Sequence, residues 1–266
     1  MEYAMKLMYP FLSVLLFLSL LFCAACGTKP PANTDPTTPD TDPITDPITE
    51  ATTEPPVTEA PKTITICCVG DSITEGVGSS SSSQFSYPAQ LQNMLGKGYR
   101  VINCGKSKAT AMDSSSPYWN TNGIAYNTTV QYRTALRVKG DIYLVMLGTN
   151  DAKLVTKTNE KSMDDYREAM EALFSAIEEA TPDAEIIVVS SPYRFEDAAR
   201  QKNQEEAIYP LQKELAEKHS YCFLDLFSYT KEIVTGGKTI NSDKLHFTDE
   251  GYRLLAEFFF NALTEN

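Results

Sequence analysis

The sequence predicts an α/β protein with three layers, in which a five-stranded parallel sheet lies between two layers of helices. Apolar runs of strand length alternate along the chain with longer amphipathic stretches of helix length, and this alternation is typical of a parallel sheet with helical crossovers. The run Ile142–Leu147 contains no alternating polar residues, as expected of a strand that is buried on both faces. Together the two observations favour helices on both faces of the sheet.

The predicted elements fill residues 63–266 in strict alternation. Strands are expected at Ile64–Val69, Arg100–Cys104, Ile142–Leu147, Ile186–Val189 and Tyr221–Leu226. Helices are expected at Tyr87–Leu95, Tyr126–Val138, Ser162–Ala180, Asp197–His219 and Asp249–Leu263. Pro210 lies inside the fourth helical stretch, so this helix should be divided there or start again.

Two segments precede this domain. Residues 1–26 combine a basic start at Lys6 with an uncharged apolar run, which predicts an export signal. The small residues before Cys26 resemble a bacterial lipobox, which implies lipidation of Cys26; an uncleaved membrane helix is the alternative. Residues 27–62, rich in Pro, Thr and Asp, predict a disordered linker. Both alternatives place the domain outside the cytoplasm, on the outer face of the bacterial cell membrane.

Composition narrows the possible partners. The formal net charge of −12 argues against a nucleic-acid-binding protein, which needs basic patches. Cys67, Cys68, Cys104 and Cys222 lie in apolar runs without the spacing of a metal site, so neither a metal nor another cofactor is expected. They are interpreted as core residues, with a bridge to Cys104 from the neighbouring strand as the alternative.

Polar residues directly follow the predicted strands, where open parallel sheets bind their ligands. Asp71 and Ser72 follow the first strand, and Asp243 and His246 lie between the last strand and the last helix. Serine becomes a useful nucleophile when a base takes its proton and a third group orients the base. A serine at a strand exit with a distant Asp/His pair therefore indicates a nucleophilic hydrolase. Asp71 and Asp151 are expected to brace loops.

Four blocks, in this order, resemble those of the SGNH (GDSL-like) hydrolases, over about residues 64–263. They are Gly70-Asp71-Ser72, Gly105, Gly148-Thr149-Asn150-Asp151 and Asp243-Lys244-Leu245-His246. The resemblance implies the flavodoxin-like SGNH fold and a catalytic triad of Ser72, His246 and Asp243. It also implies an oxyanion hole formed by Ser72, Gly105 and Asn150. Many members carry a further glycine where this chain has Lys108.

The resemblance implies a serine esterase that hydrolyses short-chain esters through an acyl-enzyme. The predicted export signal makes it extracytoplasmic, and a monomer is expected. No long apolar lid is visible, which argues against a lipase for long acyl chains. The resemblance to secreted family members with short loops implies acetyl esters of carbohydrates as the substrates. A lysophospholipase or short-chain lipid esterase is one alternative, and a glycan-binding surface lipoprotein without activity is another. Tyr118, Trp119 and Tyr193 are candidates for substrate contacts at the rim, although an aromatic pair on a polar loop can equally pin that loop to the core.

Overall fold

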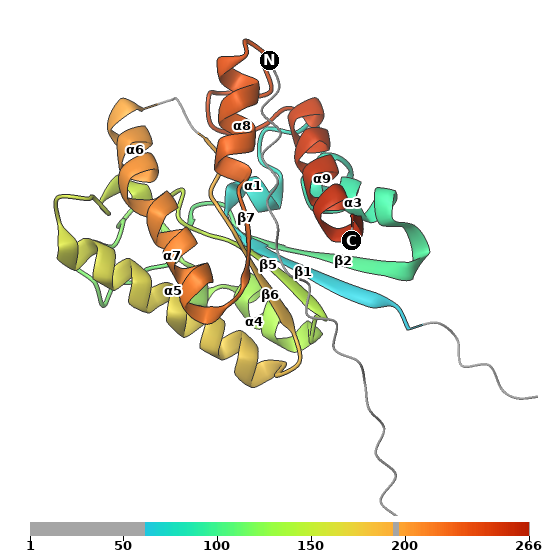
Figure 1. Cartoon of the computed structure of the whole chain (residues 1–266), viewed down its shortest axis with the longest axis horizontal. Helices are drawn as coiled ribbons and strands as arrows, with labels where there is room; N and C mark the ends of the chain where they lie inside the picture. Colours follow the sequence, from blue (N-terminus) through green and yellow to red (C-terminus); the bar gives the residue numbers. More distant parts are fainter. Residues whose placement is uncertain (1–61, 194–196, 266) are drawn as a thin grey trace, which may run out of the picture. The chain divides into compact units, whose positions relative to one another are not determined.

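The computed structural model describes residues 62–193 and 197–265, in which five strands form one parallel sheet (Figure 1). The strand order is β2-β1-β5-β6-β7, and every neighbouring pair is parallel. The strands are β1 (Ile64–Gly70), β2 (Tyr99–Gly105), β5 (Ile142–Met146), β6 (Glu185–Val189) and β7 (Cys222–Leu224). The predicted class and strand count are confirmed. The predicted signal, Cys26 and most of the predicted linker lie outside the described residues.

Helices cover both faces of the sheet, as predicted (Figure 1). One face packs against α4 (Val130–Val138), α5 (Glu160–Ala180) and α7 (Tyr209–His219). The other packs against α3 (Tyr87–Leu95), α8 (Leu226–Thr235) and α9 (Asp249–Thr264). Shorter elements are α1 (Ser72–Glu75), α2 (Ser82–Phe85), α6 (Ala198–Asn203) and the two-residue parallel strands β3 (Ala109–Thr110) and β4 (Ile124–Ala125). No helix in the described part of the chain is long and apolar enough to cross a membrane.

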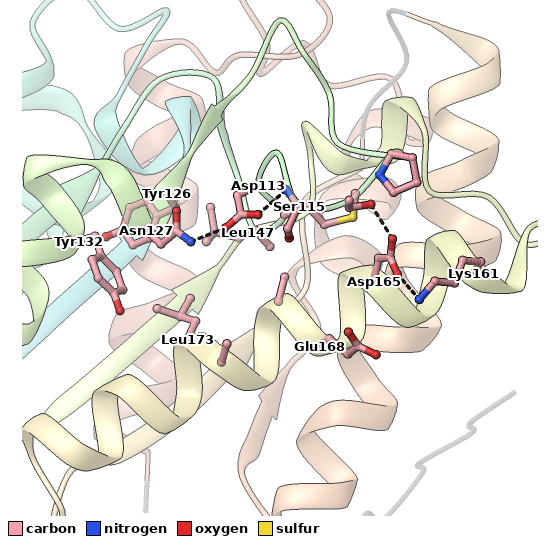
Figure 2. Close-up of a pocket in the computed structure, with 16 residues that line it drawn as sticks. Asp113, Ser115, Tyr126, Asn127, Tyr132, Leu147, Lys161, Asp165, Glu168 and Leu173 are labelled. Atoms are coloured by element: carbon pink, nitrogen blue, oxygen red, sulfur yellow. Dashed lines mark hydrogen bonds and ion pairs between the residues drawn. The ribbon is translucent and has the colours of Figure 1, made fainter.

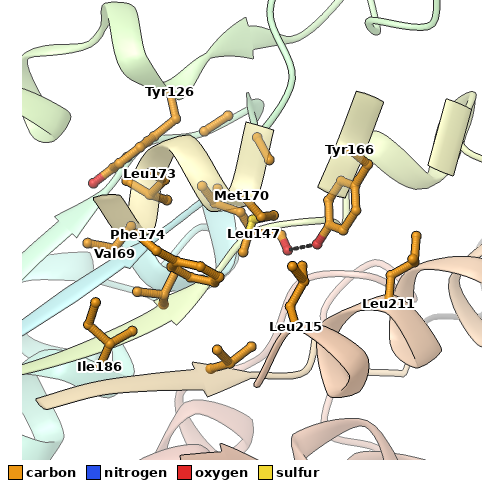
Figure 3. Packing of buried hydrophobic residues seen from close by; sticks show 14 of the residues in the cluster. Val69, Tyr126, Leu147, Tyr166, Met170, Leu173, Phe174, Ile186, Leu211 and Leu215 are labelled. Carbon is orange, nitrogen blue, oxygen red and sulfur yellow. Dashed lines mark hydrogen bonds between the residues drawn. The ribbon is translucent and has the colours of Figure 1, made fainter. Parts of the chain in front are cut away.

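The two cores follow from the alternation of side chains along each strand. In β1, Cys67 and Val69 enter the core beneath α5, whereas Ile66 and Cys68 enter the core beneath α9. Figure 3 shows the first core, where Phe174 of α5 lies among the side chains of the sheet. Burying one such large apolar side chain contributes about 1.5–3 kcal/mol, so these two layers fix the sheet between its helices. Cys67, Cys68 and Cys104 are free thiols in the core, as predicted, and the sulfurs of Cys67 and Cys104 lie 3.5 Å apart. Cys222 is also a free thiol but is exposed at the start of β7, so the core interpretation is wrong for this residue.

Two of the predicted helices differ from the observed ones for local reasons. α4 begins at Val130 and not at Tyr126, because Thr129 caps it by accepting the N–H of Tyr132 at 3.0 Å. The stretch predicted as one helix from Asp197 is α6, a π-helical segment at Gln204–Ile208, and α7. Pro210 lies in the first turn of α7, which confirms that a helix starts again there.

The sequence prediction missed α8. The last strand ends at Leu224, two residues before its predicted end, and Leu226 already belongs to the helix. Asp225 causes the change, because its Oδ1 accepts the N–H of Ser228 at 2.9 Å and so caps the helix. An apolar run that continues from a strand into a helix has no break in hydrophobicity to mark the boundary.

Candidate active site

Ser72 is placed by a sharp change of direction at the end of β1. Asp71 lies between the end of β1 and Ser72. It is buried, and its Oδ1 accepts the N–H of Ile73 at 2.9 Å, so it caps α1. Ser72 is therefore the first residue of a short helix, where backbone N–H groups have no partner within the helix. The packing is tight, because a Cβ on Gly70 would lie 2.9 Å from the backbone oxygen of Met146. The expectation that Asp71 braces a loop is confirmed.

The structure brings Ser72, His246 and Asp243 together although 174 residues separate the serine from the histidine. The Oγ of Ser72 lies 2.9 Å from Nε2 of His246, and Nδ1 of His246 lies 2.7 Å from Oδ2 of Asp243. One carboxylate thus contacts the ring nitrogen that faces away from the serine. This arrangement lets His246 accept a proton from Ser72 while Asp243 fixes the ring tautomer.

A tight turn holds the histidine ring in this position. Oδ1 of Asp243 accepts the N–H groups of Leu245 and His246, at 3.1 and 2.7 Å. Lys244, between them, has a φ of +64°, a left-handed conformation that is uncommon outside glycine. Partial burial acts to raise the pKa of Asp243, but the hydrogen bonds from His246 outweigh it, and the pKa of this carboxyl is lowered. Asp243 therefore stays ionised, as a partner of an imidazolium must.

The glycine-rich loop after α1 also touches the histidine. A Cβ on Gly78 would lie 2.8 Å from the Cβ of His246, and the φ of Gly78 is +93°. Three hydrogen bonds anchor this loop to α9. The backbone N–H and the hydroxyl of Ser80 donate to Oδ1 and Oδ2 of Asp249, at 2.7 and 2.6 Å, and the hydroxyl of Tyr252 donates to the backbone oxygen of Val77 at 2.6 Å. The loop supports the His246 side of the site, a role that its Gly/Ser composition did not indicate.

Packing requires a glycine at position 105, and the N–H of Gly105 already donates a hydrogen bond within the protein. A Cβ at this position would lie 2.2 Å from the backbone nitrogen of Glu75, so the glycine lets β2 approach the backbone of α1. The N–H of Gly105 donates to Oδ1 of Asn103 at 2.9 Å. An oxyanion role for this N–H would require it to leave Asn103. The side chain of Asn103 also donates to the backbone oxygen of Thr74 at 2.8 Å, and no sequence motif predicted either contact.

Asn150 lies on the loop that follows β5, and its side chain contacts β3. Its Nδ2 donates to the backbone oxygen of Ala109 at 2.9 Å, and its own backbone oxygen accepts from Nδ2 of Asn120 at 3.2 Å. An amide nitrogen carries two hydrogens, so one remains for a substrate oxygen. Asn120 is a supporting residue that the sequence analysis did not single out.

The neighbouring carboxyl of Asp151 fixes the segment that follows β3. Asp151 is fully buried, and its two oxygens accept the N–H groups of Ala111 and Met112, each at 3.1 Å. Burial raises the pKa of Asp151 to about 7, more than these N–H groups lower it. The expectation that Asp151 braces a loop is confirmed, and the braced segment directly follows β3, whose Ala109 accepts the hydrogen bond from Asn150.

The raised pKa predicts a pH dependence of stability. A carboxyl whose pKa is higher in the folded state stabilises that state fully below its ordinary pKa of 3.8 and loses this contribution as the pH rises through about 7. We expect the difference in free energy of unfolding between the wild type and Asp151→Asn to fall from pH 5 to pH 8. Urea denaturation at several pH values measures it. Parallel stability curves for the two proteins would show that Asp151 does not titrate there.

Lys108 takes up the backbone conformation that a glycine would adopt. Its φ is +66°, in the left-handed region, where a residue with a side chain costs roughly 1–2 kcal/mol. Its backbone oxygen accepts the N–H of Ile124 at 2.9 Å, which joins β3 to β4. The lysine in place of the expected glycine therefore adds backbone strain to this loop.

The aromatic rim candidates hold loops in place. Nε1 of Trp119 donates to Oγ1 of Thr110 at 3.0 Å, and the rings of Trp119 and Tyr118 pack against the core under α5. The hydroxyl of Tyr193 accepts from Nε2 of Gln201 at 2.6 Å, and its ring packs against Phe227. Of the two alternatives for the aromatic pair, the contacts favour pinning of the loop. No cluster of metal-ligating side chains occurs within residues 62–193 and 197–265.

Comparisons with known proteins relate the chain to ester hydrolases. The sequence profile of the GDSL-like Lipase/Acylhydrolase family matches residues 68–254. An acetylxylan esterase from Xylanibacter ruminicola is 27% identical over 226 residues, which are 77% of this chain and 44% of that protein. The chain thus spans less than half the length of this relative.

Solved structures share the fold at low sequence identity. An acetylxylan esterase from Geobacillus stearothermophilus has a TM-score of 0.57 and 20% identity, over 76% of this chain and 95% of that one. A carbohydrate acetylesterase from Sinorhizobium meliloti has a TM-score of 0.57 and 20% identity, over 76% and 99%. A lipase/acylhydrolase from Enterococcus faecalis has a TM-score of 0.56 and 21% identity, over 75% and 95%. At these identities the likeness establishes the fold.

Proposed function

Because the chain belongs to the GDSL-like lipase/acylhydrolase family, and is thus a carboxylic ester hydrolase of the SGNH type, we propose that it is a serine esterase that removes acetyl groups from carbohydrates. The observation that carries the proposal is the chain of contacts from the Oγ of Ser72 through His246 to Asp243, at 2.9 and 2.7 Å. A protein that only binds glycans has no need of this arrangement.

In the acylation step, the Oγ of Ser72 attacks the carbonyl carbon of the acetyl ester while Nε2 of His246 takes the hydroxyl proton. The C–O bond to the sugar then breaks, and the same proton passes to the leaving sugar oxygen. Water attacks the acetyl-serine by the same route and gives its proton to His246, which returns it to Ser72 as acetate leaves. Asp243 stabilises the imidazolium in both halves of the reaction.

The tetrahedral intermediates carry a negative oxygen that needs fixed hydrogen-bond donors. The N–H of Ser72 at the start of α1 and the second amide hydrogen of Asn150 are the donors best supported by the local geometry. Gly105 becomes a third donor when its N–H leaves Oδ1 of Asn103 and donates to the substrate oxygen. Losing one such donor typically costs about 100–1,000-fold in rate.

Relatives support acetylated carbohydrate as the substrate class. The curated relative is an acetylxylan esterase, and two of the structural neighbours are named for the same type of reaction. The test is acetate release from acetylated xylan, acetylated mannan, acetylated peptidoglycan and a lysophospholipid, with the fatty acid measured for the last. The proposal expects acetate from at least one polysaccharide and no fatty acid release. Hydrolysis of the lysophospholipid alone would overturn it in favour of a lipid esterase.

We also propose that the protein is exported and anchored to the outer face of the cell membrane through a lipid on Cys26. The support is the apolar run in residues 1–26, which ends in small residues directly before this cysteine. Labelled palmitate fed to expressing bacteria should enter the wild-type protein but not Cys26→Ser. Equal labelling of both proteins, or of neither, would contradict the anchor.

A further inference from the structure

A cavity of about 420 Å³ lies beside α5, outside the site described above (Figure 2). It is open to solvent and lined by the 111–117 loop, by Tyr126 and Asn127, by Tyr132 of α4, and by one face of α5. Ser72, Gly105, Asn150 and His246 do not line it. Ligand pockets in proteins usually measure about 300–1,000 Å³, so this cavity has room for a small ligand or for one unit of a longer one.

The two ends of the cavity differ in chemistry. Tyr126, Tyr132 and Leu173 lie at one end, with the two tyrosine rings edge to face at 6.0 Å (Figure 2). The other end carries the charged side chains of Asp165 and Glu168 on α5. An apolar aromatic surface beside hydrogen-bond acceptors matches a sugar ring, which has C–H faces and a rim of hydroxyl groups.

Hydrogen bonds hold two of the carboxylates in the ionised state. The pKa of Asp113 is lowered by hydrogen bonds from Ser115 and from Nδ2 of Asn127. The pKa of Asp165 is lowered by Lys161, whose Nζ lies 2.7 Å away, and by the hydroxyl of Ser116. Ionised carboxylates accept hydrogen bonds only, so the cavity offers acceptors for hydroxyl donors.

Glu168 adds an acceptor that is still available. It projects from α5 at the cavity, and within the described residues its carboxylate has neither a hydrogen bond nor an ion pair (Figure 2). Three carboxylates against the single ammonium of Lys161 make the lining acidic. Such a lining repels uronate or phosphate groups, and its charged end does not suit an acyl chain.

We propose that this cavity is a second binding site for an uncharged sugar unit of a glycan chain, separate from the site of ester cleavage. The choice of a sugar as the ligand rests on the proposed function, whereas the presence of a binding site rests on the cavity alone. Its wall is built by Ala111 and Met112, whose N–H groups are held by Asp151 next to Asn150. A polysaccharide held here would raise the local concentration of its ester groups near Ser72.

The test is direct binding, measured by isothermal titration calorimetry with unacetylated xylohexaose and mannohexaose. Ala172 is an exposed residue of α5 that lines the cavity, so Ala172→Trp should block it. Ser175, one turn further along α5, is exposed and does not line the cavity, which makes Ser175→Trp the matched control. We expect Ala172→Trp to weaken binding at least about 10-fold and Ser175→Trp to bind like the wild type.

A second pair of variants probes the acceptor at the charged end without adding bulk. Glu168→Gln should weaken binding about 10-fold, as expected for a lost hydrogen bond to a charged group, whereas the exposed Glu179→Gln should have no effect. All four variants should hydrolyse a small chromogenic acetate like the wild type. Binding of neither oligosaccharide, equal binding by Ala172→Trp, or equal affinity for an oligogalacturonate would overturn the proposal. These outcomes do not depend on whether any acetylated polysaccharide is hydrolysed.

Discussion

Ser72→Ala should lower kcat for a chromogenic acetate ester by at least about 1,000-fold, because no other group replaces the attacking oxygen. The substitution removes a single buried oxygen atom, which contacts His246 at 2.9 Å. Because so little packing is lost, the fold should remain intact. Steady-state hydrolysis measures the loss, and circular dichroism measures the fold.

Ser83→Ala is a suitable control. Ser83 is exposed on α2, and in the described part of the chain its hydroxyl contacts only the hydroxyl of Ser81, at 3.2 Å. It should retain wild-type activity. Turnover of Ser72→Ala within a factor of a few of the wild type would assign the nucleophile to another residue and reject the proposed mechanism.

Gly105→Ala should be the second most damaging change. Its new Cβ would meet three backbone atoms of α1, at 2.2 Å from the nitrogen of Glu75, 2.6 Å from the carbon of Thr74 and 2.8 Å from the Cα of Glu75. Backbone atoms cannot rotate away, so β2 and α1 must separate. Ser72 opens α1 and would move with it. Displacements of about 1 Å at a reacting group cost on the order of 100-fold in rate.

We expect kcat to fall about 100-fold or more, with a loss of about 1–3 kcal/mol in the free energy of unfolding, as for other overpacked sites. Gly98→Ala is the matched control, because a Cβ there meets nothing within 4 Å and the φ of Gly98 is not positive. Urea denaturation and ester hydrolysis are measured on both. Wild-type kcat in Gly105→Ala would show that the crowding relaxes without moving Ser72.

Much of the fold could be predicted because the pattern of an apolar run followed by an amphipathic stretch is repeated along the chain. Apolar runs such as Ile142–Leu147 mark strands that are buried on both faces, and their alternation with amphipathic stretches predicts the parallel sheet. The ends of such strands share one edge of the sheet, so Ser72 and Asn150 could be assigned to that edge before any coordinates. The sequence prediction missed α8 because a single side-chain cap, that of Asp225, determines where this helix begins.

Parts of the site depend on contacts that no motif records. The N–H of Gly105 turns to Asn103 because that side chain lies two residues back on the same strand. In the sequence, Trp119 and Tyr193 are candidates for substrate contacts at the rim, yet each side chain has a hydrogen-bond partner from a neighbouring segment. The cavity beside α5 joins a loop, a helix face and two tyrosines, and its acceptors become apparent only when these pack together.

The most direct measurement is covalent labelling with a fluorophosphonate, followed by mapping of the modified peptide by mass spectrometry. An activated serine attacks phosphorus, the P–F bond breaks and fluoride leaves, so the peptide gains the mass of the phosphonyl group. With His246 at 2.9 Å from its Oγ, Ser72 should carry this mass, and activity should fall in step with labelling. An adduct on any other residue, or an esterase that keeps its full activity in the presence of the reagent, would contradict Ser72 as the nucleophile.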